Sequence, residues 1–358
     1  MSGARLRIAL IAPPWFEVPP RAYGGIESLV ANLAEGLVVR GHDVVVIGAG
    51  EDRTSAQFLC TYHEPPSARL GEPVPEVLHA AMAQRLLKEL DVDVVHDHSL
   101  AGPLTAGARR VPTVVTAHSP VDGEFADYYQ QLGDTVHLVA DSEAQRRQAP
   151  HLNWVGHVHP AVDVQSYPYR EDKEDFVLFL GRFDPRKGAH LAIDIARAAG
   201  CPIILAGKLN EAPEHDYFDC EIKPRLGTDA QYVGMADSCS KRELLSAARC
   251  LLFPIQWEEP FGIVLVEALA CGTPVVATRR GAVPEIIKNG ATGELRNEVS
   301  ELAAAVDAVG DINPAVCRAE AVARFDTSIM AMLYARIYEH VRQQTWSGHT
   351  RDPGRDSG

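Results

Sequence analysis

The sequence predicts an α/β protein built from two doubly wound parallel sheets. Three observations support this fold class: short apolar runs that alternate with helical patterns, a second series of the same kind after a polar segment, and a length of 358 residues. A chain of this length exceeds what one hydrophobic core usually organises, so two domains are expected. We place the domains at residues 1–165 and 166–325, followed by a terminal helix over 326–345 and a disordered tail over 346–358.

The first half of the chain opens with a β-α-β pattern. Residues 7–12 form an apolar run typical of a buried strand, the apolar spacing over 26–37 predicts a helix, and 44–47 predicts the next strand. Two strands joined through a helix indicate a parallel pair. Further strands of this half are expected at 92–95, 113–116 and 136–140.

The second half repeats the pattern after a polar stretch at 160–175, which contains prolines and a run of charges and is the best linker candidate. Strands are expected at 176–180, 202–206, 231–233, 250–253 and 274–277, and helices at 190–199, 241–248 and 263–270. Two sheets joined by a short linker leave a crevice between their strand ends, where ligands of such folds usually bind.

Composition and charge exclude several classes of protein. Apolar residues make up 46% and charged residues 23%, as in ordinary globular proteins, and the net charge of -14 disfavours a nucleic-acid partner. The apolar run at 8–12 is too short for a signal peptide or a membrane span, so we expect a cytoplasmic protein without an integral membrane segment. The seven cysteines form no CxxC pair, which disfavours a disulfide framework and a zinc site.

A cationic segment follows the strand expected at 176–180. Its sequence, Gly-Arg-Phe-Asp-Pro-Arg-Lys-Gly over 181–188, precedes a predicted helix. Arg182 is a forked donor, Lys187 is a compact charge, and Gly188 lets the backbone pass close to a ligand, which suits a diphosphate. A solvated basic turn would have the same composition, so charge alone leaves both interpretations open.

Two carboxylates, Glu259 and Glu267, are separated by seven residues in a later segment. Pro260 and Gly262 indicate that Glu259 lies in a loop and Glu267 in the helix that follows. Such a junction offers unpaired N–H groups and charged acceptors, which can bind the hydroxyls of a ribose and of a sugar. An exposed position for Glu267 on its helix is the competing interpretation.

Glycines at 24 and 25 precede the first predicted helix, whose N-terminus suits a phosphate or another anionic group. A flexible turn is the alternative. The segment 48–53 resembles GxGxxG, but it carries Arg53 where the third glycine is needed and two acidic residues beside it, so we reject a dinucleotide site.

The histidines match no zinc-ligand spacing, and we therefore predict no bound metal. The residues concerned are His96, His98, His151, His157 and His159. His118 differs from them in position, because it ends the strand expected at 113–116 and should face the crevice.

Taken together, these segments resemble glycosyltransferase family 4, the retaining nucleotide-sugar-dependent transferases of GT-B fold. The resemblance covers about residues 5 to 345. Its most specific parts are the carboxylate pair in 259–278 and the Gly-Ala-Val-Pro-Glu segment at 281–285. Residues 181–188 are similar to the diphosphate loop of the family, 206–208 to a second landmark, and 24–27 to its N-terminal donor loop.

The resemblance implies two Rossmann-like domains that face a central cleft, with the acceptor bound by the first and the donor by the second. Arg182 and Lys187 would bind the donor diphosphate. Glu259 would bind the transferred sugar and Glu267 the ribose, with His118 beside the sugar. The other expected donor-binding residues are Gly24, Gly25, Gly181, Lys208, Gly234, Met235, Phe261, Gly262 and Ile263. The terminal helix would cross back onto the first domain.

The implied function is retaining transfer of a sugar from a nucleoside-diphosphate sugar, with UDP favoured, to a hydroxyl of a glycan, a lipid or a small natural product. No cofactor or metal is expected, because two cations and a helix N-terminus would already neutralise the diphosphate. Two alternatives stay open: a GT-B relative with epimerase or phosphorylase activity, and a non-catalytic nucleotide-sugar-binding subunit. A lipid acceptor would place the protein at the membrane periphery; the oligomeric state is not predicted.

Overall fold

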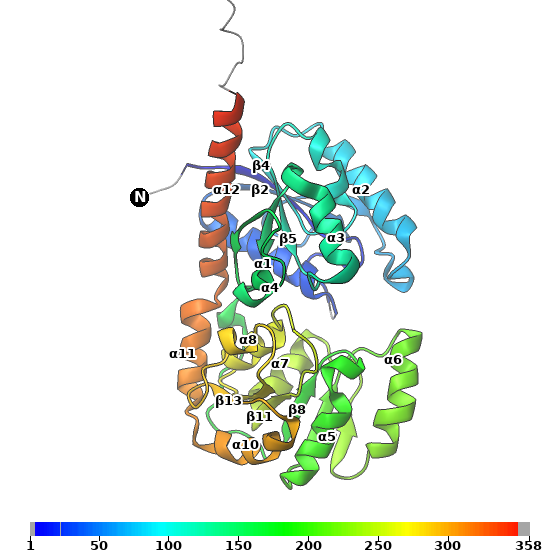
Figure 1. The fold of residues 1–358 in the computed structure, drawn as a ribbon, viewed down its shortest axis with the longest axis vertical. Helices are drawn as coiled ribbons and strands as arrows, with labels where there is room; N and C mark the ends of the chain where they lie inside the picture. Colours follow the sequence, from blue (N-terminus) through cyan, green and yellow to red (C-terminus); the bar gives the residue numbers. More distant parts are fainter. Residues whose placement is uncertain (1–3, 22, 350–358) are drawn as a thin grey trace, which may run out of the picture.

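The computed structural model describes residues 4–21 and 23–349. Within these residues the chain forms a seven-stranded and a six-stranded sheet, and the strands of every neighbouring pair run parallel. Figure 1 shows two α/β lobes, with the red terminal helix beside the first of them. The expected fold class is therefore confirmed. We call the lobes N-terminal and C-terminal.

Strand order in the N-terminal lobe is β3-β2-β1-β4-β5-β6-β7, and in the C-terminal lobe β10-β9-β8-β11-β12-β13. The N-terminal strands are β1 (Arg7–Ile11), β2 (Asp43–Ala49), β3 (Gln57–Tyr62), β4 (Val94–Asp97), β5 (Thr113–Ala117), β6 (His137–Ala140) and β7 (Trp154–His157). The C-terminal strands are β8 (Val177–Leu180), β9 (Ile203–Ala206), β10 (Ala230–Tyr232), β11 (Cys250–Phe253), β12 (Val275–Thr278) and β13 (Gly293–Arg296). The order reverses between β1 and β4 and between β8 and β11, the switch points at which open sheets of this kind bind ligands.

Helices connect successive strands and cover both faces of the first sheet. They are α1 (Gly25–Val39), α2 (Pro73–Leu87), α3 (Gly123–Leu132), α4 (Glu143–Gln148), α5 (Ala189–Ala198), α6 (Ala212–Tyr217), α7 (Ser238–Ala247), α8 (Ile263–Ala270), α9 (Val283–Ile286), α10 (Leu302–Ala308), α11 (Pro314–Arg324) and α12 (Thr327–His349). Alternate residues of β1 point to opposite faces. Leu10 therefore packs in the core beneath α1 and α12, whereas Ile11 packs with residues of α2 on the other face.

Three of the strands that border the sheets, β3, β7 and β13, have no counterpart among the strands predicted from the sequence. A central strand of a parallel sheet is buried on both faces and gives a continuous apolar run. Residues of β3 and β7 are mostly half-buried, and β13 alternates buried and half-buried positions. Their mixed polarity removed the signal that identified the central strands.

The chain crosses between the lobes twice, and the two crossings lie side by side. The linker between β7 and β8 carries Val162, whose N–H donates to the Phe325 carbonyl at 3.0 Å. The Val162 carbonyl accepts from the Thr327 N–H at 3.1 Å, where α12 begins. The return crossing thus fixes the start of α12 against the linker.

Helix α12 packs on α1 of the N-terminal lobe, where Tyr334 and Tyr338 are fully buried. A Cβ on Gly36 of α1 would lie 2.8 Å from Ala331, so glycine permits this close approach. The helix continues to His349, which corrects the expected disordered tail at 346–349, because no proline interrupts the chain before Pro353. The rest of that expected tail, 350–358, lies outside the described residues.

Candidate active site

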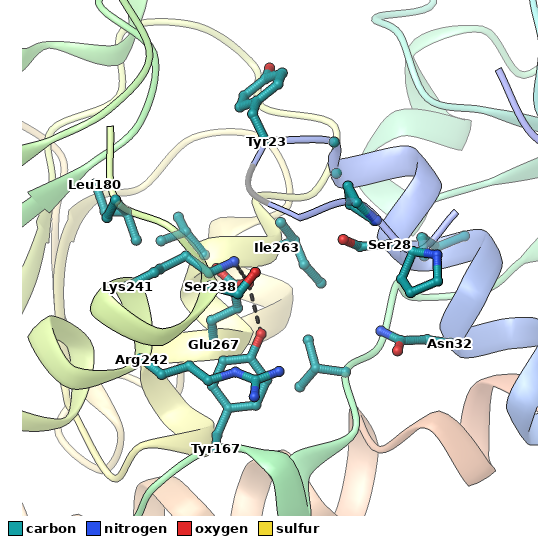
Figure 2. A pocket seen from close by; sticks show the side chains of 18 of the residues that line it. Tyr23, Ser28, Asn32, Tyr167, Leu180, Ser238, Lys241, Arg242, Ile263 and Glu267 are labelled. Carbon is teal, nitrogen blue, oxygen red and sulfur yellow. Dashed lines mark hydrogen bonds and ion pairs between the residues drawn. The ribbon is translucent and has the colours of Figure 1, made fainter. Parts of the chain in front are cut away.

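A cavity of about 300 Å³ lies between the lobes at the carboxyl ends of the strands. The N-terminal lobe contributes residues of α1 and of the loop before it, and the C-terminal lobe contributes the ends of β8 and β9, α7 and α8. Figure 2 shows Ser28 and Asn32 of α1 facing Lys241, Arg242 and Glu267 across this space. The cavity is therefore made by both lobes together.

Eight of the predicted site residues line the cavity. They are Gly24, Gly25, Gly181, Arg182, Lys208, Met235, Ile263 and Glu267. The remaining predicted residues do not line it: His118, Lys187, Gly234, Glu259, Phe261 and Gly262. These six lie in the loops beside the cavity or at strand ends, and their roles stay predictions.

Arg182 follows β8 and is half-buried at the cavity wall. Its guanidinium makes no hydrogen bond or ion pair with any part of the chain that the structure describes. Burial from water is costly for a charge without a partner, so an unpaired guanidinium on a cavity wall is suited to an anionic ligand. Gly207, which follows β9, lets the backbone there approach the end of β8 closely, because a Cβ on Gly207 would lie 1.8 Å from the Gly181 carbonyl oxygen.

Lys187 and Glu259 pair with each other, with Nζ 2.5 Å from Oε2. Trp257 Nε1 donates to the same carboxylate oxygen at 2.9 Å, and the Lys187 ammonium also lies over the Trp257 ring at 5.2 Å. Gly281 fits against this loop, since a Cβ there would meet the backbone of Glu259 at 2.3 Å. The two charges predicted to bind the diphosphate and the sugar are thus neutralised by one another in this state.

The segment after Glu259 leads directly into α8. Phe261 is buried, with its ring 5.4 Å from that of His159. Gly262 takes a positive φ of 88° and ends the loop, so that the first turn of α8 starts at Ile263 on the cavity wall. Positive φ costs glycine little, which explains this residue at the turn.

Glu267 lies one helical turn further along α8 and is buried. Its Oε1 accepts hydrogen bonds from Tyr167 at 2.8 Å and from Lys241 at 2.5 Å, and Figure 2 shows both. Arg242 lies over the Tyr167 ring at 4.7 Å. The competing interpretation of Glu267 as an exposed helix residue is therefore wrong.

The loop before α1 closes the cavity from the N-terminal lobe. Gly24 has a φ of 143°, and a Cβ there would lie 2.8 Å from Pro20. Glu27, in the first turn of α1, is buried behind this loop. Burial raises the pKa of Glu27 to about 7, although backbone N–H groups of Glu27 itself and of Phe16 act in the opposite direction.

Lys208 and Met235 form the end of the cavity beside β9 and β10. Lys208 is buried and forms ion pairs with Glu211 and Glu214 at the start of α6, and its ammonium lies 5.3 Å from the centre of the Tyr23 ring. Gly234 precedes Met235 with a φ of 85° and accepts a hydrogen bond from Gly207.

His118 belongs to a buried hydrogen-bonded chain in the N-terminal lobe. Its Nδ1 lies 3.2 Å from Asp141 Oδ2, and its Nε2 lies 2.9 Å from His98 Nδ1. Because a carboxylate only accepts, Nδ1 carries the proton toward Asp141, and in the neutral ring Nε2 accepts from His98. Both ring nitrogens are thus occupied, a constraint that the sequence did not reveal.

A second histidine, His96, packs on this chain with its ring centre 3.9 Å from that of His98, and forms separate hydrogen bonds toward α12 and β5. His96 Nδ1 lies 2.7 Å from the Tyr338 hydroxyl, and His96 Nε2 lies 2.8 Å from Thr116 Oγ1. Burial lowers the pKa of His96 and of His98 well below the usual value, and neighbouring histidines lower both further. These two rings are therefore neutral at physiological pH.

Contacts between the lobes surround α4. Ser142 Oγ donates to the Pro260 carbonyl at 2.6 Å. Glu285 of the C-terminal lobe accepts from the Glu143 N–H at 3.0 Å, from the Ala144 N–H and from His159 Nε2 at 3.2 Å. Burial raises the pKa of Glu285, but these three donors outweigh burial and lower it overall.

Sequence reasoning did not identify several of the residues that line the cavity. The main polar ones are Ser28, Asn32, Tyr167, Ser238, Lys241 and Arg242. Most of them lie on helix faces or in the linker, where no motif marks them. The adjacent cations Lys241 and Arg242 were the one usable signal, and helical spacing alone does not show which face of α7 they occupy.

In the described part of the chain, no group of three or more His, Cys, Asp or Glu side chains could hold a metal ion. None of the helices in residues 4–21 and 23–349 has the length and apolar character needed to span a bilayer.

Comparison with known proteins follows the two lobes. Residues 23–168 match the family described as Glycosyltransferase Family 4, and residues 166–314 match that described as Glycosyl transferases group 1. A phosphatidyl-myo-inositol mannosyltransferase of Mycobacterium leprae is 29% identical, covering 94% of this chain and 97% of the relative. A glycogen synthase of Mycobacterium tuberculosis is 28% identical, with coverages of 93% and 94%.

Among solved structures, AviGT4, a glycosyltransferase involved in avilamycin A biosynthesis, is 27% identical. Its alignment has a TM-score of 0.74 and covers 94% of this chain and 98% of that one. The two family matches adjoin at the linker, and these relatives extend over nearly the whole chain. The chain therefore belongs to glycosyltransferase family 4 and is a glycosyltransferase of GT-B fold.

Proposed function

We propose that the protein transfers a hexose or related sugar from a nucleoside-diphosphate sugar to an acceptor hydroxyl, with retention of anomeric configuration and without a divalent metal. The observation that carries this proposal is Arg182, whose guanidinium has no hydrogen bond or ion pair within residues 4–21 and 23–349 and lies on the wall of a cavity built by both lobes. The names of the relatives, a mannosyltransferase and a glycogen synthase, support a hexose as the transferred group.

The chemistry requires stabilisation of a departing nucleoside diphosphate. The bond from the anomeric carbon to the phosphate oxygen breaks, and negative charge grows on that oxygen. Arg182 would bind this charge more strongly as it develops, which is the condition for catalysis. The acceptor oxygen would bond to the anomeric carbon on the same face, and its proton would pass to the leaving phosphate.

Lys187 would join Arg182 at the diphosphate by leaving the Glu259 carboxylate and pairing with the diphosphate instead. It is paired with Glu259 at 2.5 Å. A diphosphate carries more charge than one carboxylate, so Lys187 can move toward it and release Glu259 for the sugar hydroxyls. Glycines 24 and 25 would cover the sugar from the N-terminal lobe, and Glu267 would bind the ribose.

The nucleotide is favoured to be UDP, and GDP is the alternative that the experiment below must distinguish. The acceptor is a glycan, a lipid or a small natural product. The relatives include a phosphatidyl-myo-inositol mannosyltransferase and a protein of avilamycin biosynthesis, which supports the last two classes. We propose a cytoplasmic location, peripheral to the membrane if the acceptor is a lipid.

A donor panel combined with a matched pair of variants tests the function. UDP, GDP, ADP and TDP sugars are screened by thermal shift, because a bound ligand raises the melting temperature, and hits are assayed with acceptor pools. Arg182→Ala should lower turnover about a hundredfold or more, equivalent to the loss of about 2–4 kcal/mol of transition-state binding.

The matched control is Arg186→Ala. Arg186 lies on the same loop, but it is exposed and already paired with Asp184 at 2.7 Å, so its loss should change turnover less than about threefold. Wild-type turnover in Arg182→Ala would contradict the proposed mechanism. Donor consumption without a glycoside product would favour an epimerase or a phosphorylase.

A further inference from the structure

Glu267 is held asymmetrically. Tyr167 and Lys241 both donate to Oε1, at 2.8 and 2.5 Å. Oε2 makes no hydrogen bond with residues 4–21 or 23–349, and it is not among their buried unpartnered atoms. One oxygen is thus fixed by the protein while the other stays open on the cavity wall.

Tyr167 is itself rigidly placed. It lies in the linker between the lobes, where its carbonyl accepts from Arg318 at 2.8 Å and its N–H donates to the Val164 carbonyl at 3.1 Å. The Arg242 guanidinium covers its ring at 4.7 Å. Burial, together with the adjacent Glu267 carboxylate, raises the pKa of the Tyr167 phenol far above its usual value. The phenol therefore remains a donor, and its position follows that of the linker.

Lys241 supplies the complementary charge. It stands in α7, so its ion pair with Glu267 joins two helices of the C-terminal lobe. The side chain of Glu267 is only 8% exposed, and burying a lone carboxylate there would be costly. Lys241 compensates the charge of the carboxylate in the wall, and a paired carboxylate of this kind can accept a charge-assisted hydrogen bond.

From this geometry we infer that Tyr167 and Lys241 are positioning residues, which aim Oε2 of Glu267 at the ribose hydroxyls of the nucleotide and thereby select ribonucleotides. The inference rests on the proposed function and extends it to residues that no motif marks. Vicinal hydroxyls are neutral donors, and a carboxylate with one fixed and one free oxygen is a directional acceptor for them. A bond of this kind discriminates by about 10- to 100-fold.

Calorimetric titration of the full chain tests the inference. UDP, GDP and ADP are titrated first, and the nucleotide that binds most tightly is compared with its 2′,3′-dideoxy counterpart. Wild type should prefer the ribonucleotide about tenfold or more. Tyr167→Phe and Lys241→Met should each reduce this preference at least threefold, and Lys241→Arg should retain most of it. A purely structural role would weaken both nucleotides equally and leave their ratio unchanged.

Matched controls are Tyr169→Phe, which removes an exposed phenol of the same linker, and Lys223→Met, which removes an exposed lysine. Both should keep the wild-type ratio. An unchanged ratio in Tyr167→Phe and Lys241→Met, or no preference in wild type, overturns the inference and leaves the proposed function standing. Failure of wild type to bind any of the three nucleotides overturns both. A variant with a collapsed melting temperature is set aside, and the other variant decides.

Discussion

The two sides of the cleft differ in how their polar groups are satisfied. The C-terminal side presents charges: Arg182 has no partner in the described residues, and Lys187 is paired with Glu259. The N-terminal side presents neutral polar groups, among them the side chains of Ser28 and Asn32 of α1. The first side is suited to a charged group that replaces existing partners, and the second to neutral hydroxyls. This difference agrees with the proposed transfer from a diphosphate donor to a hydroxyl acceptor.

The substitution Lys187→Ala should have the largest effect and tests the role of the charges on the C-terminal side. Turnover should fall about a hundredfold, as expected for a lost diphosphate contact. Unlike Arg182→Ala, this variant should also lose about 1–3 kcal/mol of stability, because Glu259 keeps Trp257 as its one remaining side-chain donor in the described chain. Steady-state kinetics and urea unfolding measure the two effects.

Equal stability of Lys187→Ala and wild type would show that Glu259 does not need the pair. Wild-type turnover would remove Lys187 from the mechanism. The double variant Lys187→Ala/Glu259→Gln serves as the control, since it removes the uncompensated charge and should recover part of the stability.

A second prediction concerns the buried carboxyl group of Glu27 on the N-terminal side. Since the pKa of Glu27 is raised to about 7, the folded protein binds a proton more tightly than the unfolded chain. Folding stability should therefore fall as pH rises from about 4.5 to 7, by on the order of 3 kcal/mol from this residue. In Glu27→Gln this contribution to the fall should disappear. The stability of the variant relative to that of wild type should therefore rise between pH 5 and pH 8.

Chemical unfolding at several pH values makes the measurement. Buried His96 and His98 act in the opposite sense, because their lowered pKa values mean that stability is lost as pH falls below about 6.5. The difference between Glu27→Gln and wild type cancels this common contribution. A difference independent of pH would contradict the raised pKa of Glu27.

The smallest expected effect tests the support of the histidines by α12. Tyr338→Phe removes the hydroxyl that bonds His96 Nδ1 at 2.7 Å and leaves a buried ring nitrogen unpaired. Stability should fall by about 1–3 kcal/mol, while Tyr169→Phe at an exposed position should change it by less than about 0.5 kcal/mol. Thermal unfolding distinguishes them, and equal melting temperatures would show that His96 finds another partner.

The central part of the fold could be predicted from the sequence, because its strands are buried on both faces. Runs such as 44–47 and 250–253 are apolar throughout and became β2 and β11. Border strands could not be recognised in the same way, since a segment such as Gly-Glu-Leu-Arg in β13 shows its strand character only when β12 pairs with it. Helix α2 was also missed, because its exposed surface carries Val74, Val77 and Leu78 and blurs the helical pattern.

The candidate site divides in the same manner. Motif positions follow single strands, so Arg182 and Glu267 could be assigned to the crevice from local sequence. Their partners come from other elements: Tyr167 from the linker and Lys241 from α7. The bond between His118 and His98 joins the ends of β5 and β4, so only the sheet order brings the rings together. Side-chain pairing across elements is the part that the sequence did not reveal.

Glu285 links the two lobes through the hydrogen bonds that its carboxylate accepts. Its carboxylate gathers two backbone donors of α4 and one imidazole donor from the opposite lobe. Parting the lobes would remove all three donors from a single anion, so this carboxylate is one of the contacts that hold the lobes together, beside the hydrogen bond from Ser142 to the Pro260 carbonyl. The lowered pKa of Glu285 keeps this carboxylate ionised at neutral pH, and only strongly acidic solution would protonate it and weaken its contacts with the N-terminal lobe.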